Sequence, residues 1–157
     1  MSYTNSDGLY VLSNGDEGTV VNDGGALNSV KYLVVDIPDA TLVASGAVAP
    51  TPNEAYIPAG SYITMAKLVV TTAWTSGGSG TLGIGLQTAA GVAIDADGID
   101  AAIAKTALAV NTAVNCNGAL VNAAATVGAA DAYIALNYGT AVFTAGAGKL
   151  VIQYITV

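Results

Sequence analysis

Short apolar segments separated by glycine-rich turns run through most of this sequence, and they restrict the chain to a β fold. The clearest is TLGIGLQT at residues 81–88, where Leu82, Ile84 and Leu86 alternate with smaller or polar residues. Further strands are predicted in the segments SVKYLVVDIP, ATLVASGAV, DAYIALNYG and KLVIQYITV, at residues 29–38, 40–48, 131–139 and 149–157. Several strands at this spacing predict an all-β antiparallel sandwich or barrel.

The segment 62–73 predicts a long strand that is apolar on both faces. Its even positions include Leu68 and Val70, and its odd positions include Ile63, Met65 and Val69. A strand with one face in water alternates more cleanly than this. Two interpretations follow: a second sheet of the same chain covers the second face, or a neighbouring copy of the chain covers it.

Two glycines mark the strand 81–88 as a place of close packing. Gly83 and Gly85 share the face opposite Leu82, Ile84 and Leu86. Because glycine has no side chain, this face forms a flat strip that another backbone or an aromatic ring can approach closely.

One short helix is predicted, from Asp97 to about Lys105. Asp97 is a suitable N-cap, Asp100 falls in the first turn, and Ile99 and Ile103 lie four residues apart. The following stretch, 106–127, is rich in alanine and asparagine and favours neither helix nor strand. A final strand that runs to the last residue is expected to lie inside a sheet.

Residues 1–28 differ from the rest and predict an extended or irregular N-terminal arm, followed by one β-sandwich domain at 29–157. Glycine, asparagine and aspartate dominate the arm. Its apolar residues form a candidate interface with a neighbouring subunit; they are Tyr3, Leu9, Tyr10, Val11, Val20 and Val21. A loose terminus without such a contact is the alternative interpretation.

The charge inventory excludes several partners. The chain has four lysines, no arginine, no histidine and eleven acids, for a net charge of -7, and charged residues make up only 10% of it. Four scattered lysines cannot neutralise a run of phosphates, so nucleic acid and anionic membranes are disfavoured. The uncharged stretches are too rich in glycine and asparagine for lipid-facing helices. Residues 1–11 lack the pattern of a secretory signal, so we expect synthesis in the cytoplasm.

The sequence contains no recognisable catalytic signature, so no enzyme activity and no cofactor are predicted. Without histidine, triads and metal sites that use imidazole are excluded. Cys116 is the single cysteine and is interpreted as a small buried side chain, because no histidine or arginine is present to activate a thiol.

The segment DADGID holds the only carboxylate cluster, formed by Asp95, Asp97 and Asp100. Three acids around a glycine make a weak calcium candidate, but the distal glutamate of an EF-hand loop is missing. A structural role in a helix cap and a turn is the preferred interpretation, and no metal site is assigned.

A resemblance to a known group of proteins rests on residues 56–100. This stretch contains an IPAG turn, a strand ending in TTAW, a Gly/Ser loop, a TLGIG strand and an acidic DG turn, in that order. The pattern resembles capsid decoration (cement) proteins and head fibres of tailed bacteriophages of the marine or cyanophage type. The resemblance implies a jelly-roll-like sandwich that assembles as a homo-oligomer, with a trimer favoured, on the outer surface of a capsid.

The predicted function is therefore that of a structural virion protein. The resemblance implies the major capsid protein and further copies of the chain as partners, and the virion exterior as its location. The alternative is a head-fibre or adhesin module that binds carbohydrate or a host surface. That alternative needs an exposed aromatic platform, for which Trp74 beside the loop TSGGSG is the candidate.

Overall fold

The computed structural model describes residues 2–4, 10–12, 30–37 and 56–156. Its elements are β1 (Ser2–Thr4), β2 (Tyr10–Leu12), β3 (Val30–Ile37), β4 (Tyr56–Ile57), β5 (Tyr62–Ser76), β6 (Thr81–Gln87), β7 (Ala93–Ala104), a 3₁₀ turn (Lys105–Ala107), β8 (Ala113–Asn115), β9 (Ala132–Gly139) and β10 (Phe143–Ile155). The predicted strand at 40–48 lies outside the described residues.

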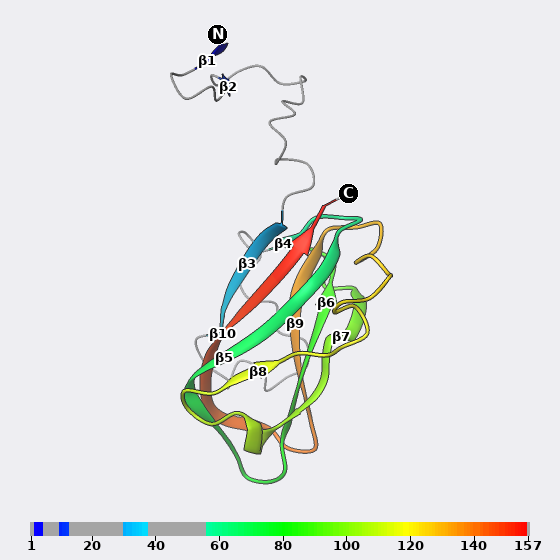
Figure 1. The fold of residues 1–157 in the computed structure, drawn as a ribbon. Helices are drawn as coiled ribbons and strands as arrows, with labels where there is room; N and C mark the ends of the chain where they lie inside the picture. Colours follow the sequence, from blue (N-terminus) through cyan, green and yellow to red (C-terminus); the bar gives the residue numbers. More distant parts are fainter. Residues whose placement is uncertain (1, 5–9, 13–29, 38–55, 157) are drawn as a thin grey trace.

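The strands form two four-stranded antiparallel sheets, with the orders β3-β10-β5-β8 and β4-β9-β6-β7, while β1 and β2 pair only with each other (Figure 1). Side chains from both four-stranded sheets meet in one core; Leu68 and Leu150 come from the first sheet, and Ile84 and Ile134 from the second. The predicted all-β sandwich is confirmed. The described residues contain no helix that could span a membrane.

The C-terminal strand lies in the middle of its sheet, as predicted. β10 pairs with β3 from Gly148↔Ile37 to Ile155↔Val30 without a register shift, and on its other side it pairs with β5 (Figure 1). Leu150 and Ile152 of β10 have no exposed surface. The strand also begins earlier than predicted, at Phe143.

A β-bulge explains why β5 looks apolar on both faces. Gln153 pairs with Met65 and Tyr154 pairs with Ile63, so Thr64 has no partner of its own. One extra residue reverses the alternation. Ile63 therefore points into the core together with Ala66, Leu68 and Val70. The second sheet covers this inner face, whereas Met65 on the outer face remains exposed.

The glycine strip on β6 is approached closely from two sides, as predicted. A Cβ atom at Gly85 would lie 2.3 Å from the carbonyl oxygen of Ala96, and one at Gly83 would lie 2.1 Å from Asn137 Oδ1. Asn137 Nδ2 donates a hydrogen bond of 2.8 Å to the same Ala96 oxygen. The approaching groups are thus a backbone and an amide, and both faces of β6 are buried.

The predicted helix from Asp97 to Lys105 is wrong, because these residues belong to β7 and only a 3₁₀ turn follows. Ile84 of β6 pairs with Asp100 of β7, and Leu86 pairs with Asp95. An advance of two residues along β6 is thus matched by five residues along β7. The extra residues form the bulge whose backbone crosses Gly85. Ile99 and Ile103 are both buried, although the register shifts by one further residue where Ile103 pairs with Leu82 and Asp100 with Ile84.

The stretch 106–127, which favoured neither element, closes one side of the sandwich. Its backbone bonds to β5 at four places: Trp74 N donates to Leu108 O, Val70 N to Thr112 O, Cys116 N to Ala66 O and Asn122 N to Ile63 O. Gly118 N and Leu120 N donate to Ile99 O and Gly98 O of β7. An irregular segment thus joins the edges of both sheets.

Candidate functional site

The outer surface of the β3-β10-β5 sheet carries exposed apolar side chains. Val30, Tyr32 and Val34 are the outward apolar residues of β3, with 47%, 62% and 53% of their surface exposed, and Asp36 continues the same row. Val151 of β10 lies opposite Val34, and Met65 of β5 completes the patch. We call these five apolar residues the β3 face. Apolar patches of this kind mark interaction surfaces more often than scattered apolar residues do.

Hydrogen bonds across the strands hold Tyr32 in place on the β3 face. Thr64 Oγ1 donates to Gln153 Oε1 at 2.8 Å, and Gln153 Nε2 donates to the Tyr32 hydroxyl at 2.7 Å. Gln153 lies opposite both Tyr32 and Met65 in the register. A tyrosine fixed in this way offers a large contact area at little entropic cost.

Charge lies at one end of this surface. Lys149 Nζ donates to Asp36 Oδ1, and both side chains are more than half exposed, so the pair contributes little to stability. Lys67 lies opposite Val151 on the same face of the sheet. The five residues of the β3 face are themselves uncharged, and the charged side chains of Asp36, Lys149 and Lys67 border it beside Val34 and Val151. An apolar centre with a polar rim suits contact with another protein surface.

The structure does not assemble the three aspartates of DADGID into a metal site. Asp100 is buried, and its two oxygens accept hydrogen bonds from Ala102 N at 3.2 Å and Asn117 N at 3.3 Å. Asp95 Oδ1 accepts from Asp97 N at 3.3 Å, and desolvation together with Asp97 raises the pKa of Asp95. Within the described parts of the chain, no group of three acids, cysteines or histidines could hold a metal ion.

Cys116 is buried in the core beside β5. Burial raises the pKa of its thiol to about 12, and the charge of Asp100 adds to the rise. The thiolate needed for nucleophilic chemistry is absent at neutral pH. This is the environment of a structural cysteine.

We expect Cys116 to react about 1,000-fold more slowly with iodoacetamide at pH 8 in the folded protein than in urea, because far less thiolate is present. An unfolded thiol loses its proton above about pH 8.5 while the folded one keeps it. The folded state then binds more protons, so stability falls between about pH 8.5 and 12. Melting curves of Cys116→Ala should show a smaller fall. Equal alkylation rates with and without urea would contradict the buried thiol.

Trp74 cannot serve as a carbohydrate platform, and the prediction that placed it there is wrong. Only 3% of its surface is exposed. Its indole meets Phe143 edge to face, with ring centroids 5.0 Å apart, and covers Gly146. The described residues do hold exposed aromatic surface elsewhere, at Tyr32 and at Tyr56, whose ring lies 5.7 Å from that of Tyr133.

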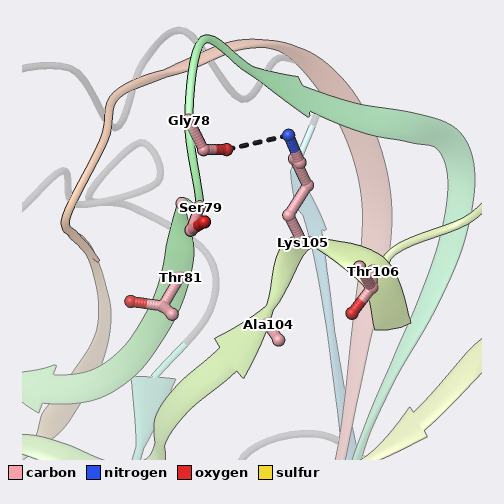
Figure 2. A pocket seen from close by; sticks show the side chains of 7 residues that line it. Gly78, Ser79, Thr81, Ala104, Lys105 and Thr106 are labelled. Atoms are coloured by element: carbon pink, nitrogen blue, oxygen red, sulfur yellow. Dashed lines mark hydrogen bonds between the residues drawn. The ribbon is translucent and has the colours of Figure 1, made fainter.

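A hollow of about 490 Å³ lies at the end of the sandwich beside Lys105. Figure 2 shows the lysine side chain extending from the end of β7 toward the loop that joins β5 and β6. Its Nζ donates to Gly78 O at 2.8 Å and to Ser76 O at 3.2 Å. The ammonium group therefore holds this loop in place, and the hollow is an unassigned surface feature.

The predicted interface residues of the N-terminal arm are only partly described. Tyr3 lies in β1 and pairs with Val11 of β2, and Tyr10 also lies in β2. Leu9, Val20 and Val21 lie outside the described residues. Whether the arm contacts a neighbour stays a prediction.

Sequence reasoning did not single out Tyr32 and Val34 as surface residues. The signal was present: in VKYLVVDI both the odd and the even positions are apolar, as in β5. Such a strand contributes Val35 and Ile37 to the core and leaves a second apolar row for the surface.

Comparison with solved structures finds the same fold in two phage capsids. A chain from the cyanophage Pam1 capsid asymmetric unit matches over 100% of both chains, with a TM-score of 0.53 and 15% identity. A chain from the capsid of Ralstonia phage GP4 covers 91% of this chain and 93% of its own, with the same TM-score and identity. At this identity the likeness is one of fold. No protein-family model and no curated protein matches the sequence.

Proposed function

We propose that this protein is a structural virion component that binds the outer surface of a phage capsid and stabilises contacts between major capsid proteins. The observation that carries the proposal is the likeness in fold, end to end, to a chain of the Pam1 capsid. The resemblance of residues 56–100 to decoration proteins, drawn from the sequence, points in the same direction.

The surface chemistry supports this role. A chain with 10% charged residues and a net charge of -7 suits contact with protein more than contact with packaged DNA. The β3 face offers an uncharged apolar patch for such a contact. We further propose a jelly-roll-like homo-oligomer, with a trimer favoured, and a role that is not enzymatic.

Adding the purified protein to empty shells of the virus that encodes it should raise the temperature at which those shells open. A ligand present at 100 times its dissociation constant stabilises its bound partner by about 2.7 kcal/mol per site. Scanning calorimetry with shells alone, protein alone and the mixture measures the effect. Binding without any change in the opening temperature would refute the stabilising role.

The head-fibre or adhesin alternative now depends on a different surface. Tyr56 is 44% exposed and its ring lies beside that of Tyr133 on the β4 edge of the second sheet. Two partly exposed tyrosine rings side by side can bind a sugar ring. A glycan array at high protein concentration tests this, and binding that is lost in Tyr56→Ala would favour the alternative.

A further inference from the structure

β3 is a long strand, and one of its edges pairs with no other strand in the described part of the chain. It stands first in the order β3-β10-β5-β8, and its eight residues pair with β10 without a register shift (Figure 1). In an antiparallel pair, alternate residues direct both N–H and C=O away from the partner strand, so about four residues of β3 do so. A regular edge with exposed apolar side chains is a template for another strand.

Several other edges within the described residues are short or covered, whereas β9 beyond Tyr133 also lacks a described partner strand on the side of β4. β4 has two residues and β8 has three. β7 contains the bulge over Gly85, and its edge already accepts hydrogen bonds from Gly118 and Leu120. Backbone hydrogen bonds thus cover the β5 and β7 side of the sandwich, while β3 offers the described edge that combines full length, regular pairing and exposed apolar side chains.

Among the described strands, β1 and β2 pair only with each other. Each strand has three residues, and the pair forms a sheet of its own through Ser2↔Leu12, Tyr3↔Val11 and Thr4↔Tyr10. An isolated two-stranded hairpin is at best marginally stable in water. Its own outer edges and the free edge of β3 therefore complement each other.

We propose that the β1–β2 hairpin of a neighbouring copy adds to the free edge of β3, so that exchanged arms link the subunits. The inference rests on the homo-oligomer that forms part of the proposed function. Main-chain hydrogen bonds supply the attachment, and side chains of the added strand lie beside the β3 face.

The intervening chain is long enough for the hairpin to reach a neighbouring copy. Residues 13–29 separate the hairpin from β3, and an extended segment of this length spans about 60 Å. β10, the second longest strand, spans about 40 Å. Strands that pair within one chain through a hairpin need only two to five connecting residues. The segment is thus long enough to reach past its own domain.

Chemical cross-linking tests which chains pair. Val11→Cys in one preparation is mixed with Tyr32→Cys or Val34→Cys in another, and a short bismaleimide is added. We expect cross-linked dimers from these mixtures and none when the partner carries Val92→Cys, an equally exposed site on the turn between β6 and β7. A link that forms only within one chain carrying both cysteines, or no link at all, would overturn the proposal.

Solution mass and hydrogen exchange provide a second test that does not depend on cross-linking. The double variant Tyr32→Lys/Val34→Lys and a chain lacking residues 1–12 should both become monomers with unchanged circular dichroism, because edge lysines oppose strand addition. Val92→Lys should leave the oligomer intact. Backbone amides of β3 should lose protection when residues 1–12 are removed. An oligomer and an exchange pattern unaffected by that removal would contradict arm exchange.

The outcomes separate this inference from the proposed function. Cross-linked dimers that fail to bind shells leave arm exchange standing and refute the capsid role. Shell binding and stabilisation by a chain that gives no cross-links keep the capsid role and refute arm exchange.

Discussion

Replacing Gly85 with alanine is expected to lower the free energy of unfolding by about 3 kcal/mol, the upper end of the usual effect of overpacking. The added Cβ would lie 2.3 Å from the Ala96 carbonyl oxygen and 2.5 Å from that of Asp95. Both are backbone atoms of the β7 bulge, so no flexible side chain can move aside. The bulge must shift as a unit, and the hydrogen bond from Asn137 Nδ2 to Ala96 O is strained with it.

Urea unfolding followed by circular dichroism measures this loss, and Gly77→Ala is the matched control. A Cβ at Gly77 meets no atom within 4 Å, so its substitution should change stability by less than about 0.5 kcal/mol. For a protein of this size, a loss of 3 kcal/mol corresponds to a fall in Tm of about 6–12 °C. If Gly85→Ala is as stable as Gly77→Ala, the β7 backbone does not lie against β6 in the way described.

Truncating Trp74 to alanine is expected to destabilise the protein by about 4 kcal/mol, within the range measured for buried aromatic residues. The indole fills the space between Phe143 and Gly146 at one end of the core. Its removal leaves a cavity and ends the edge-to-face contact with Phe143. Gly146 has a φ of +141°, a backbone conformation that favours glycine. A larger residue at this position would therefore be strained and could not fill the cavity.

Trp74→Phe and Val92→Ala serve as controls for this effect. Trp74→Phe keeps an aromatic ring against Phe143 and should lose less than half as much stability. Val92 is 64% exposed, and its truncation should change stability by less than about 0.5 kcal/mol. Equal stability of Trp74→Ala and the native protein would place this side chain at the surface and restore it as a candidate for ligand binding.

The two sides of the sandwich differ in a way that bears on assembly. Along β5 and β7 the segment 108–122 takes up backbone hydrogen bonds and leaves little for a partner. Along the outer edge of β3 no described strand does so, and Val30, Tyr32 and Val34 are exposed apolar residues of that strand, with the charged Asp36 near its end. The arm exchange proposed above uses the β3 side.

Much of the fold could be predicted because local patterns and tertiary structure agree in several strands. β6 and β9 alternate cleanly, and their apolar residues, such as Ile84 and Ile134, have no exposed surface. β3 ends at Ile37, directly before Pro38, as the sequence indicates. In such segments the alternation of apolar residues with a period of two predicts a strand, because a helix would not place the same apolar residues on one side.

The prediction fails where the extra residues of a bulge change the period. Thr64 shifts the alternation in β5, and the bulge in β7 produced a pattern that was interpreted as a helix. A bulge is placed by the partner strand, whose register is not visible in the local sequence. The exposed row on β3 was missed for a related reason, since a strand that is apolar on both faces does not reveal which face meets the core.

The sequence by itself determined the fold class, the absence of imidazole chemistry and the low charge of the surface, because period and composition are properties of the chain alone. Tertiary structure alone decided which face of each strand is buried, that Trp74 belongs to the core, and that one edge of β3 pairs with none of the described strands. These features depend on contacts between residues far apart in the chain, such as Gly85 with Ala96 and Val30 with Ile155. These contacts stabilise the protein only after the strands have paired and the two sheets have packed together.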